Sequence, residues 1–151
     1  MNPDSSAANF DPAQLIDQLR HLALRDGLWA PRPKPKGSVL IRQGQESAGL
    51  FILQKGLVKL AYQTAAGDEW IKSFIADPGL FAANDPWSAH TPSRFTAECL
   101  EACDVVHLPL AWAGVQIARE PRLVAAYAGF SAWVRRRKEL REEALPCDNA
   151  E

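Results

Sequence analysis

Residues 35–60 read PKGSVLIRQGQESAGLFILQKGLVKL, and this stretch decides the fold class. Short runs rich in valine, isoleucine, leucine and phenylalanine are interrupted by glycine, at Gly37, Gly44 and Gly56. Strands of a β-sheet have this composition, and the glycines between them mark turns. The predicted strands are 38–42, 49–53, 57–63, 69–75 and one or two more over 95–108. Several short strands at this spacing are typical of an antiparallel sandwich or small barrel.

Helical patterns flank the β region on both sides. On the N-terminal side, Asp11-Pro12 combines a preferred capping residue with proline at the first helical position, and the segment should end at Gly27. On the C-terminal side we predict a short helix over residues 110–119 and a long helix over residues 121–145. The predicted fold class is therefore mainly β with flanking α-helices, an N-terminal one and a long C-terminal one.

The predicted organisation is one globular domain with an appended helix. The alternating prolines of residues 31–37 cannot continue a helix and should force an extended linker. The predicted boundaries are a tail at 1–10, a barrel domain with its N-terminal helix at 11–120, the long helix at 121–145 and a tail at 146–151. A chain of 151 residues is long enough for a conventional hydrophobic core.

Composition and charge argue against several classes of protein. Apolar residues make up 47% of the chain and the net charge is -1, so the chain has no basic field for direct contact with nucleic acid. The sequence lacks a signal-peptide pattern and any run of about 20 apolar residues, which predicts a cytoplasmic protein without membrane contact. The three cysteines contain no CxxC pair, so they indicate neither a disulfide framework nor a metal site.

The long C-terminal helix carries apolar residues at steps of three and four, the spacing of a helix–helix seam. Two interpretations are open: this stripe covers the chain's own barrel, or it packs against a second copy in a homodimer. A length of about 25 residues and an exposed apolar stripe favour the homodimer. The predicted dimer-interface residues are Leu123, Ala126, Tyr127, Phe130, Trp133, Val134 and Arg137. The basic run at 135–138 is interpreted as a solvated helix face.

The stretch at 35–60 also contains specific residues at informative positions in this order of elements. Gly37 precedes a strand, Gly44 lies in a turn, LFIL occupies 50–53, and Lys55-Gly56 precedes Val58-Lys59. This pattern resembles the cyclic nucleotide-binding domain of the catabolite-activator and FNR-type (Crp/Fnr) transcription regulators, over residues 12–145. The resemblance implies a double-stranded β-helix, a jelly-roll-like barrel. It also implies a non-enzymatic domain that senses an effector and signals to a DNA-binding segment not contained in this chain.

In that family the ligand lies against a phosphate-binding cassette, made of a glycine-glutamate step, a short helix and an arginine before the next strand. The resemblance places this cassette at residues 78–96, but Ala82 and Ala83 stand at the glycine and glutamate positions. Ser93 stands at the arginine position, with Arg94 one residue later. The candidate ligand-binding residues are Leu80, Phe81, Ala82, Ala83, Asn84, Ser93, Arg94, Phe95 and, from the long helix, Ser131.

The altered cassette predicts that cyclic AMP is not bound tightly. The missing glutamate removes an acceptor for the ribose hydroxyl, a charged hydrogen bond worth about 1.5 to 3 kcal/mol. In addition, Asp85-Pro86 repeats the helix-start signal of Asp11-Pro12, so Asp85 is expected to cap the cassette helix and to compete with an anion for its amides. No cofactor is therefore expected, and a cyclic nucleotide is disfavoured.

Three alternatives are left open. The chain could be a stand-alone dimerisation or protein-interaction module without a ligand. Its barrel could instead bind a more apolar effector, because Phe130 and Trp133 could fill the space of a purine. A cupin-like metalloenzyme has a similar barrel but needs clustered histidines, and His21, His90 and His107 are predicted on a helix, a loop and a strand.

Overall fold

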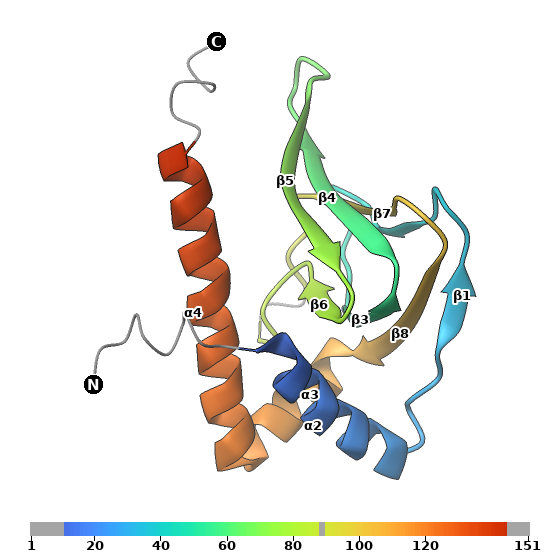
Figure 1. Ribbon diagram of the computed structural model, residues 1–151, viewed down its shortest axis with the longest axis vertical. Helices are drawn as coiled ribbons and strands as arrows, with labels where there is room; N and C mark the ends of the chain where they lie inside the picture. Colours follow the sequence, from blue (N-terminus) through green and yellow to red (C-terminus); the bar gives the residue numbers. More distant parts are fainter. Residues whose placement is uncertain (1–10, 88–89, 145–151) are drawn as a thin grey trace.

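The computed structural model describes residues 11–87 and 90–144, with side chains described up to residue 135. Its strands are β1 (Arg32–Lys34), β2 (Val39–Ile41), β3 (Gly49–Lys55), β4 (Leu57–Gln63), β5 (Glu69–Ala76), β6 (Gly79–Ala82), β7 (Thr96–Cys99) and β8 (Cys103–Pro109). Its helices are α2 (Pro12–Arg25), α3 (Leu110–Arg119) and α4 (Pro121–Ala144). The strands form a barrel flanked by the helices (Figure 1), so the predicted fold class is confirmed. Within the described residues, no helix is long and apolar enough to cross a membrane.

The barrel consists of two antiparallel sheets of four strands, in the orders β1-β8-β3-β6 and β2-β7-β4-β5. The strand predicted at 57–63 is confirmed, and those predicted at 49–53 and 69–75 extend one or two residues further. Residues 95–108 contain two strands, because the chain turns at residues 100–102 and passes from the second sheet to the first. The glycine-separated apolar runs therefore located β2 to β5, β7 and β8, whereas β6, at the start of the expected cassette, was not predicted.

The prediction of a linker at residues 31–37 is wrong in part, since Arg32–Lys34 forms the edge strand β1. Pro33 stands opposite Asp104 of β8. Proline has no backbone N–H, and an edge strand is the position in a sheet where that donor is dispensable. The prolines imposed the extended path that was expected, but they gave no signal for pairing.

Two hydrophobic cores lie on the two faces of the first sheet. Strand β3 shows the division, since Phe51 and Leu53 face the barrel interior whereas Leu50 and Ile52 belong to the core shared with the helices. This alternation follows from the strand period of two residues. A strand buried on both faces reads as a continuous apolar run, which explains why residues 49–53 stand out in the sequence.

Helix α2 covers the outer face of the first sheet. Asp11 caps it, as predicted, because its carboxylate accepts a hydrogen bond of 3.0 Å from the Ala13 backbone N–H. Leu15, Leu19 and Ala23 are buried in one cluster with residues of β3, β6 and β8. The helix-side core thus fixes α2 against the barrel.

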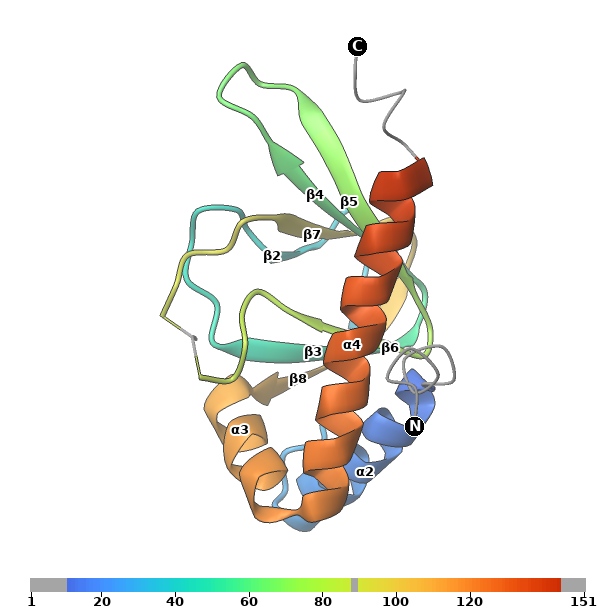
Figure 2. The same cartoon turned by 90° about the vertical axis from the view of Figure 1, so that its left-hand side faces the viewer.

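Helix α4 packs on α2 and α3 through its N-terminal half, and its C-terminal half rises beside the barrel (Figure 2). The hairpin of β4 and β5 projects beyond the other strands toward the same end of the molecule (Figures 1 and 2). Helices α2 and α3 and the projecting hairpin therefore lie at opposite ends of the barrel core.

Candidate functional site

The segment between β6 and β7, where the cassette was expected, forms an open loop. It bends at residues 83–84 and turns at residues 86–87, so the predicted short helix is absent from the described part of this segment. Pro86 lies against Gly114 of α3, where an added Cβ would stand 2.9 Å from the Pro86 Cβ. Contact with the helical layer thus sets the path of the loop, and the local helix-start signal is overridden.

Asp85 does not cap a helix, contrary to the prediction. Its carboxylate accepts a hydrogen bond of 3.0 Å from the Tyr127 hydroxyl of α4, and the Trp87 ring stands edge-on to the Tyr127 ring at 5.6 Å. Burial and the Asp85 carboxylate raise the pKa of Tyr127 to about 12, while the Ser131 hydroxyl opposes the shift. Tyr127 is therefore a neutral donor at physiological pH, and it joins the loop to α4.

The polar candidate residues of the loop mostly bond to the loop's own backbone. Asn84 Nδ2 donates a hydrogen bond of 2.7 Å to the Thr91 carbonyl. Ser93 is 3% exposed, and its hydroxyl donates to the Phe95 carbonyl at 2.7 Å and accepts from the Phe95 N–H at 3.2 Å. Arg94 is exposed between two buried neighbours. The Ser93 hydroxyl is thus engaged within its own turn, and the Arg94 side chain lies in solvent.

Apolar side chains fill the barrel interior. Phe81 and Phe51 of this interior stack with ring centroids 5.4 Å apart, and from the neighbouring strand the exposed His107 ring stacks on Phe51 at 4.8 Å. Gly49 makes room for it, because an added Cβ would overlap the His107 ring. Burial, and then the charge of Lys34, lower the pKa of His107. The buried residues of the interior are Ile41, Phe51, Leu53, Val58, Leu60, Phe81, Phe95, Ala97, Cys99, Cys103 and Val105.

Cys99 and Cys103 belong to this packed interior, and both are free thiols. Burial, followed by the contact with Cys103, raises the pKa of Cys99 to about 12. A thiol with such a pKa stays protonated at physiological pH and is a poor nucleophile. The pair therefore acts as small buried core residues.

Sequence comparison agrees with this architecture. The family described as the cyclic nucleotide-binding domain matches residues 31–111, which is more than half of the chain. This chain belongs to the cyclic nucleotide-binding domain family. The matched region runs from β1 to the start of α3 and includes the whole loop between β6 and β7. No curated protein matches the sequence.

Several solved structures share the fold of this cyclic nucleotide-binding domain. The sensor domain of the transcriptional regulator DNR from Pseudomonas aeruginosa has a TM-score of 0.67 at 20% identity, over 83% of this chain and 85% of that one. The catabolite activator protein of Thermus thermophilus has a TM-score of 0.65 at 22% identity, over 99% of this chain and 63% of that one. FixK2 from Bradyrhizobium japonicum has a TM-score of 0.63 at 13% identity, over 76% and 56%. The chain thus spans less than two thirds of the two longer proteins.

One positively charged side chain next to the candidate ligand-binding residues, Lys72, was not predicted from the sequence. The Lys72 ammonium stands 4.5 Å from the centroid of the Phe95 ring. Phe95 is the residue that follows Arg94 in the sequence, so this cation lies beside the candidate ligand-binding residues. Lys72 comes from β5, where a register shift opposite Leu60 and Ala61 leaves one extra residue in the strand. A bulge of this kind changes the side to which following side chains point, and the sequence pattern carried no signal for it.

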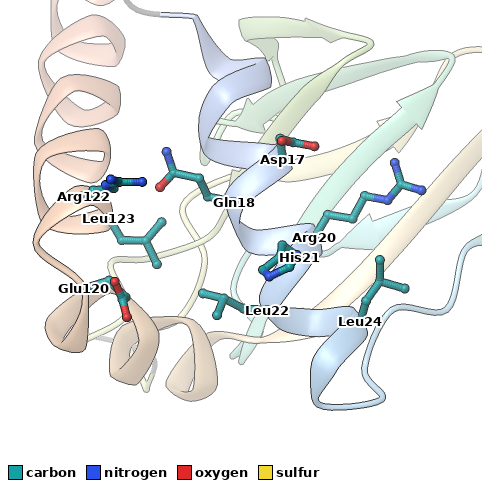
Figure 3. A pocket seen from close by; sticks show the side chains of 9 residues that line it. All are labelled: Asp17, Gln18, Arg20, His21, Leu22, Leu24, Glu120, Arg122 and Leu123. Carbon is teal, nitrogen blue, oxygen red and sulfur yellow. The ribbon is translucent and has the colours of Figure 1, made fainter.

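Two cavities of the domain lie outside the barrel, at the helical layer. The larger, of about 600 Å³, lies between α2 and the start of α4 (Figure 3). Its lining residues are Asp17, Gln18, Arg20, His21, Leu22, Leu24, Glu120, Arg122 and Leu123. The smaller, of about 180 Å³, lies between α2 and β3. None of the candidate ligand-binding residues lines either cavity. The larger cavity is lined by both acidic and basic side chains, so its charge favours neither an anionic nor a cationic ligand.

The predicted dimer-interface residues of α4 have different environments. Leu123 is buried in the chain's own core, which leaves it no surface for a second copy. The half-buried side chains are Ala126, Tyr127, Phe130 and Trp133, the last two with ring centroids 6.1 Å apart. Val134 is 43% exposed, and the side chain of Arg137 lies outside the described part of the chain. The accessible part of the stripe therefore lies toward the C-terminal half of α4.

Proposed function

We propose that this chain is the sensory domain of a Crp/Fnr-type transcription regulator and that it does not bind cyclic AMP tightly. One observation carries the proposal: the loop at the family's phosphate site is bound to the protein itself, through Asp85 and Tyr127. The domain would be a non-enzymatic module in the cytoplasm that passes a signal to a DNA-binding segment.

The chemistry of the loop supports weak binding of a ribose phosphate. Such a ligand needs free amide donors, a guanidinium and an acceptor for the ribose hydroxyl. Ala83, at the acceptor position, packs its methyl group against the barrel interior. The Asp85 carboxylate adds a negative charge to the loop, which repels a phosphate. Loss of one charged hydrogen bond alone weakens affinity roughly 10- to 150-fold.

Isothermal titration calorimetry with cyclic AMP tests this proposal. We expect no saturable heat at micromolar concentrations, because the acceptor is missing and the interior is packed. A thermal melt of the same samples is the control for folding, and saturating cyclic AMP should leave its midpoint unchanged, since only a ligand that binds the native state raises it. Saturable binding with a micromolar or lower dissociation constant would overturn the proposal.

The packed barrel interior favours a second candidate, a dimerisation or protein-interaction module without a ligand. Both candidates include a homodimer through α4, whose C-terminal half stands away from α2 and α3 (Figure 2). Native mass spectrometry of the protein purified from its own host separates them. A retained small molecule favours the sensor, a dimer without one favours the dimerisation module, and a monomer without one excludes the homodimer.

A further inference from the structure

The larger cavity of the helical layer has charged side chains at its rim and an apolar bottom (Figure 3). It lies between α2 and the start of α4 and measures about 600 Å³. Small-molecule sites usually measure about 300 to 1,000 Å³, so the cavity has the size of such a site. Leu123 is buried, Gln18 and Leu22 are half-buried, and the other lining side chains are exposed. The deepest part of the cavity therefore consists of two leucines and one amide.

The charges that α4 brings to the cavity have opposite signs at its two ends. Figure 3 shows the Arg122 side chain at the level of Gln18 of α2, with Leu123 below it. The Glu120 carboxylate lies further along, at the level of Leu22. A molecule that lies in the seam between the two helices thus meets a cation, then an apolar stretch and then an anion.

The polar lining side chains are not bonded within the described part of the chain. The nearby Asp26 carboxylate, in contrast, accepts hydrogen bonds from Arg25 at 2.8 Å and from Trp112 Nε1 at 2.9 Å. The lining side chains that take part in no hydrogen bond or ion pair of the described residues are Asp17, Gln18, Arg20, His21, Glu120 and Arg122. Two of these are acids and two are arginines, so the lining has no net charge when histidine is counted as neutral. These donors and acceptors are available to a ligand.

We propose that this cavity binds a small zwitterion with an apolar body, of the class of an apolar dipeptide with free termini. The ligand carboxylate accepts hydrogen bonds from the Arg122 guanidinium and the Gln18 amide, since a guanidinium offers a carboxylate two parallel donors. The ligand ammonium pairs with Glu120, and its side chains cover Leu22 and Leu123. The apolar stretch between the two charges favours a dipeptide over a single amino acid, whose ammonium and carboxylate are attached to one carbon atom.

The position of the cavity separates this site from the barrel. None of the candidate ligand-binding residues lines it, so the inference goes beyond the proposed function and does not depend on it. A ligand in the cavity contacts α2, which the helix-side core fixes against the barrel, and also α4. Because both helices are in place only in the folded chain, binding should raise the midpoint of thermal unfolding.

Calorimetric titration with L-leucyl-L-leucine tests the proposal. Two capped forms of the dipeptide are titrated beside it: the N-acetyl form, which lacks the ammonium, and the C-terminal amide, which lacks the carboxylate. We expect saturable binding of the free dipeptide at millimolar concentrations. Each capped form should bind about three- to fivefold more weakly, because an ion pair in contact with solvent contributes about that much.

Two variants assign the ends of the ligand to their partners. Arg122→Gln should reduce the affinity for the free dipeptide to that for its amide and leave the affinity for the amide unchanged. Glu120→Gln should have the same effect with respect to the N-acetyl form. Arg119→Gln is the matched control, since Arg119 is an exposed arginine of α3 that does not line the cavity, and it should bind all three ligands as wild type does. Thermal melts of the variants without ligand check that each is folded.

The possible results either support or contradict the site. Absence of saturable binding to wild type at millimolar concentrations contradicts it, and so does equal affinity for the free dipeptide and both capped forms. A loss of affinity in Arg119→Gln as large as in Arg122→Gln shows that the ligand lies elsewhere. Free leucine that binds as tightly as the dipeptide contradicts the separation of the two charges. All of these results leave the calorimetry with cyclic AMP unaffected, so a failure here is distinct from a failure of the proposed function.

Discussion

At the scale of single residues, the hydroxyl of Tyr127 joins the loop after β6 to helix α4. The Asp85 carboxylate accepts its hydrogen bond, and the Trp87 ring stands edge-on to the Tyr127 ring. A carboxylate beside a neutral phenol favours the protonated form, as does burial. The pKa of Tyr127, about 12, is therefore a direct report of whether the loop is joined to the helix.

A titration of Tyr127 tests this contact. The chain has two tyrosines, so Tyr62→Phe leaves Tyr127 as the single one. Replacing Asp85 by Asn keeps an acceptor oxygen but removes the charge, so the pKa of Tyr127 should fall below about 12. Phenolate absorbance against pH measures the change. Asp68→Asn, which removes an acid on the distant hairpin, is the control and should leave the titration unaltered.

The same contact sets the sign of an alkaline stability change. An unfolded tyrosine has a pKa of about 10, so the folded state holds its proton more tightly between that pH and about 12. The free energy of unfolding should therefore fall as the pH rises through this window, and it should fall less in Asp85→Asn. An equal fall in both proteins would show that Asp85 does not act on Tyr127.

Two identical dipeptides show what a local pattern can and cannot predict. Asp11-Pro12 begins α2 as expected, whereas Asp85-Pro86 begins no helix. The first is followed by an apolar stripe that packs on the barrel, so local and tertiary preferences agree. At the second, Pro86 meets Gly114 of α3 and Asp85 meets Tyr127 of α4. These partners are distant in the sequence, so no reading of the loop alone could have revealed them.

At the scale of elements, the strands could be predicted because most of them are buried on at least one face and separated by glycine turns. Two features had no such signal. Strand β1 consists of exposed or half-buried residues between prolines, so its pairing with β8 left no apolar run. The extra residue in β5 that precedes Ser73 is visible only in the register with β4. Register depends on the partner strand, which is why the environment of Lys72 was missed.

The close contact between β3 and β8 makes a second prediction. An alanine at Gly49 would overlap the His107 ring, and the ring is held by stacking on Phe51 at 4.8 Å. We expect Gly49→Ala to lower the free energy of unfolding by about 1 kcal/mol, the low end for overpacking, because the exposed His107 ring can move away at the expense of its stacking on Phe51. Urea denaturation measures the change. In a His107→Ala background the overlap is gone, so Gly49→Ala should cost much less, and strictly additive effects would contradict the contact.

At the scale of the whole molecule, the domain has one tightly packed body and two less supported projections, the β4–β5 hairpin and the C-terminal half of α4 (Figure 1). The family, the barrel and the two flanking helical regions followed from the sequence. The sequence did not predict which way the apolar stripe on α4 faces. The spacing of Leu123 fits a position in the chain's own core as well as a position in a dimer interface, and the side chain is in fact buried. Only the packing of α2 against α4 decides that Leu123 points inward.

This division of α4 predicts how thermal stability depends on concentration. If the free half of α4 is buried in a dimer, a tenfold rise in protein concentration should add about 1.4 kcal/mol per dimer and raise the midpoint of thermal unfolding. A glutamate at Val134, which is 43% exposed in the free half, should abolish this dependence by placing a charge in the interface. Val124 is 49% exposed in the half that packs on α2 and α3, outside the predicted stripe, so Val124→Glu is the matched control and should keep the dependence. Calorimetric scans over a hundredfold range decide the point, since a wild-type midpoint that does not move with concentration is incompatible with a dimer through α4.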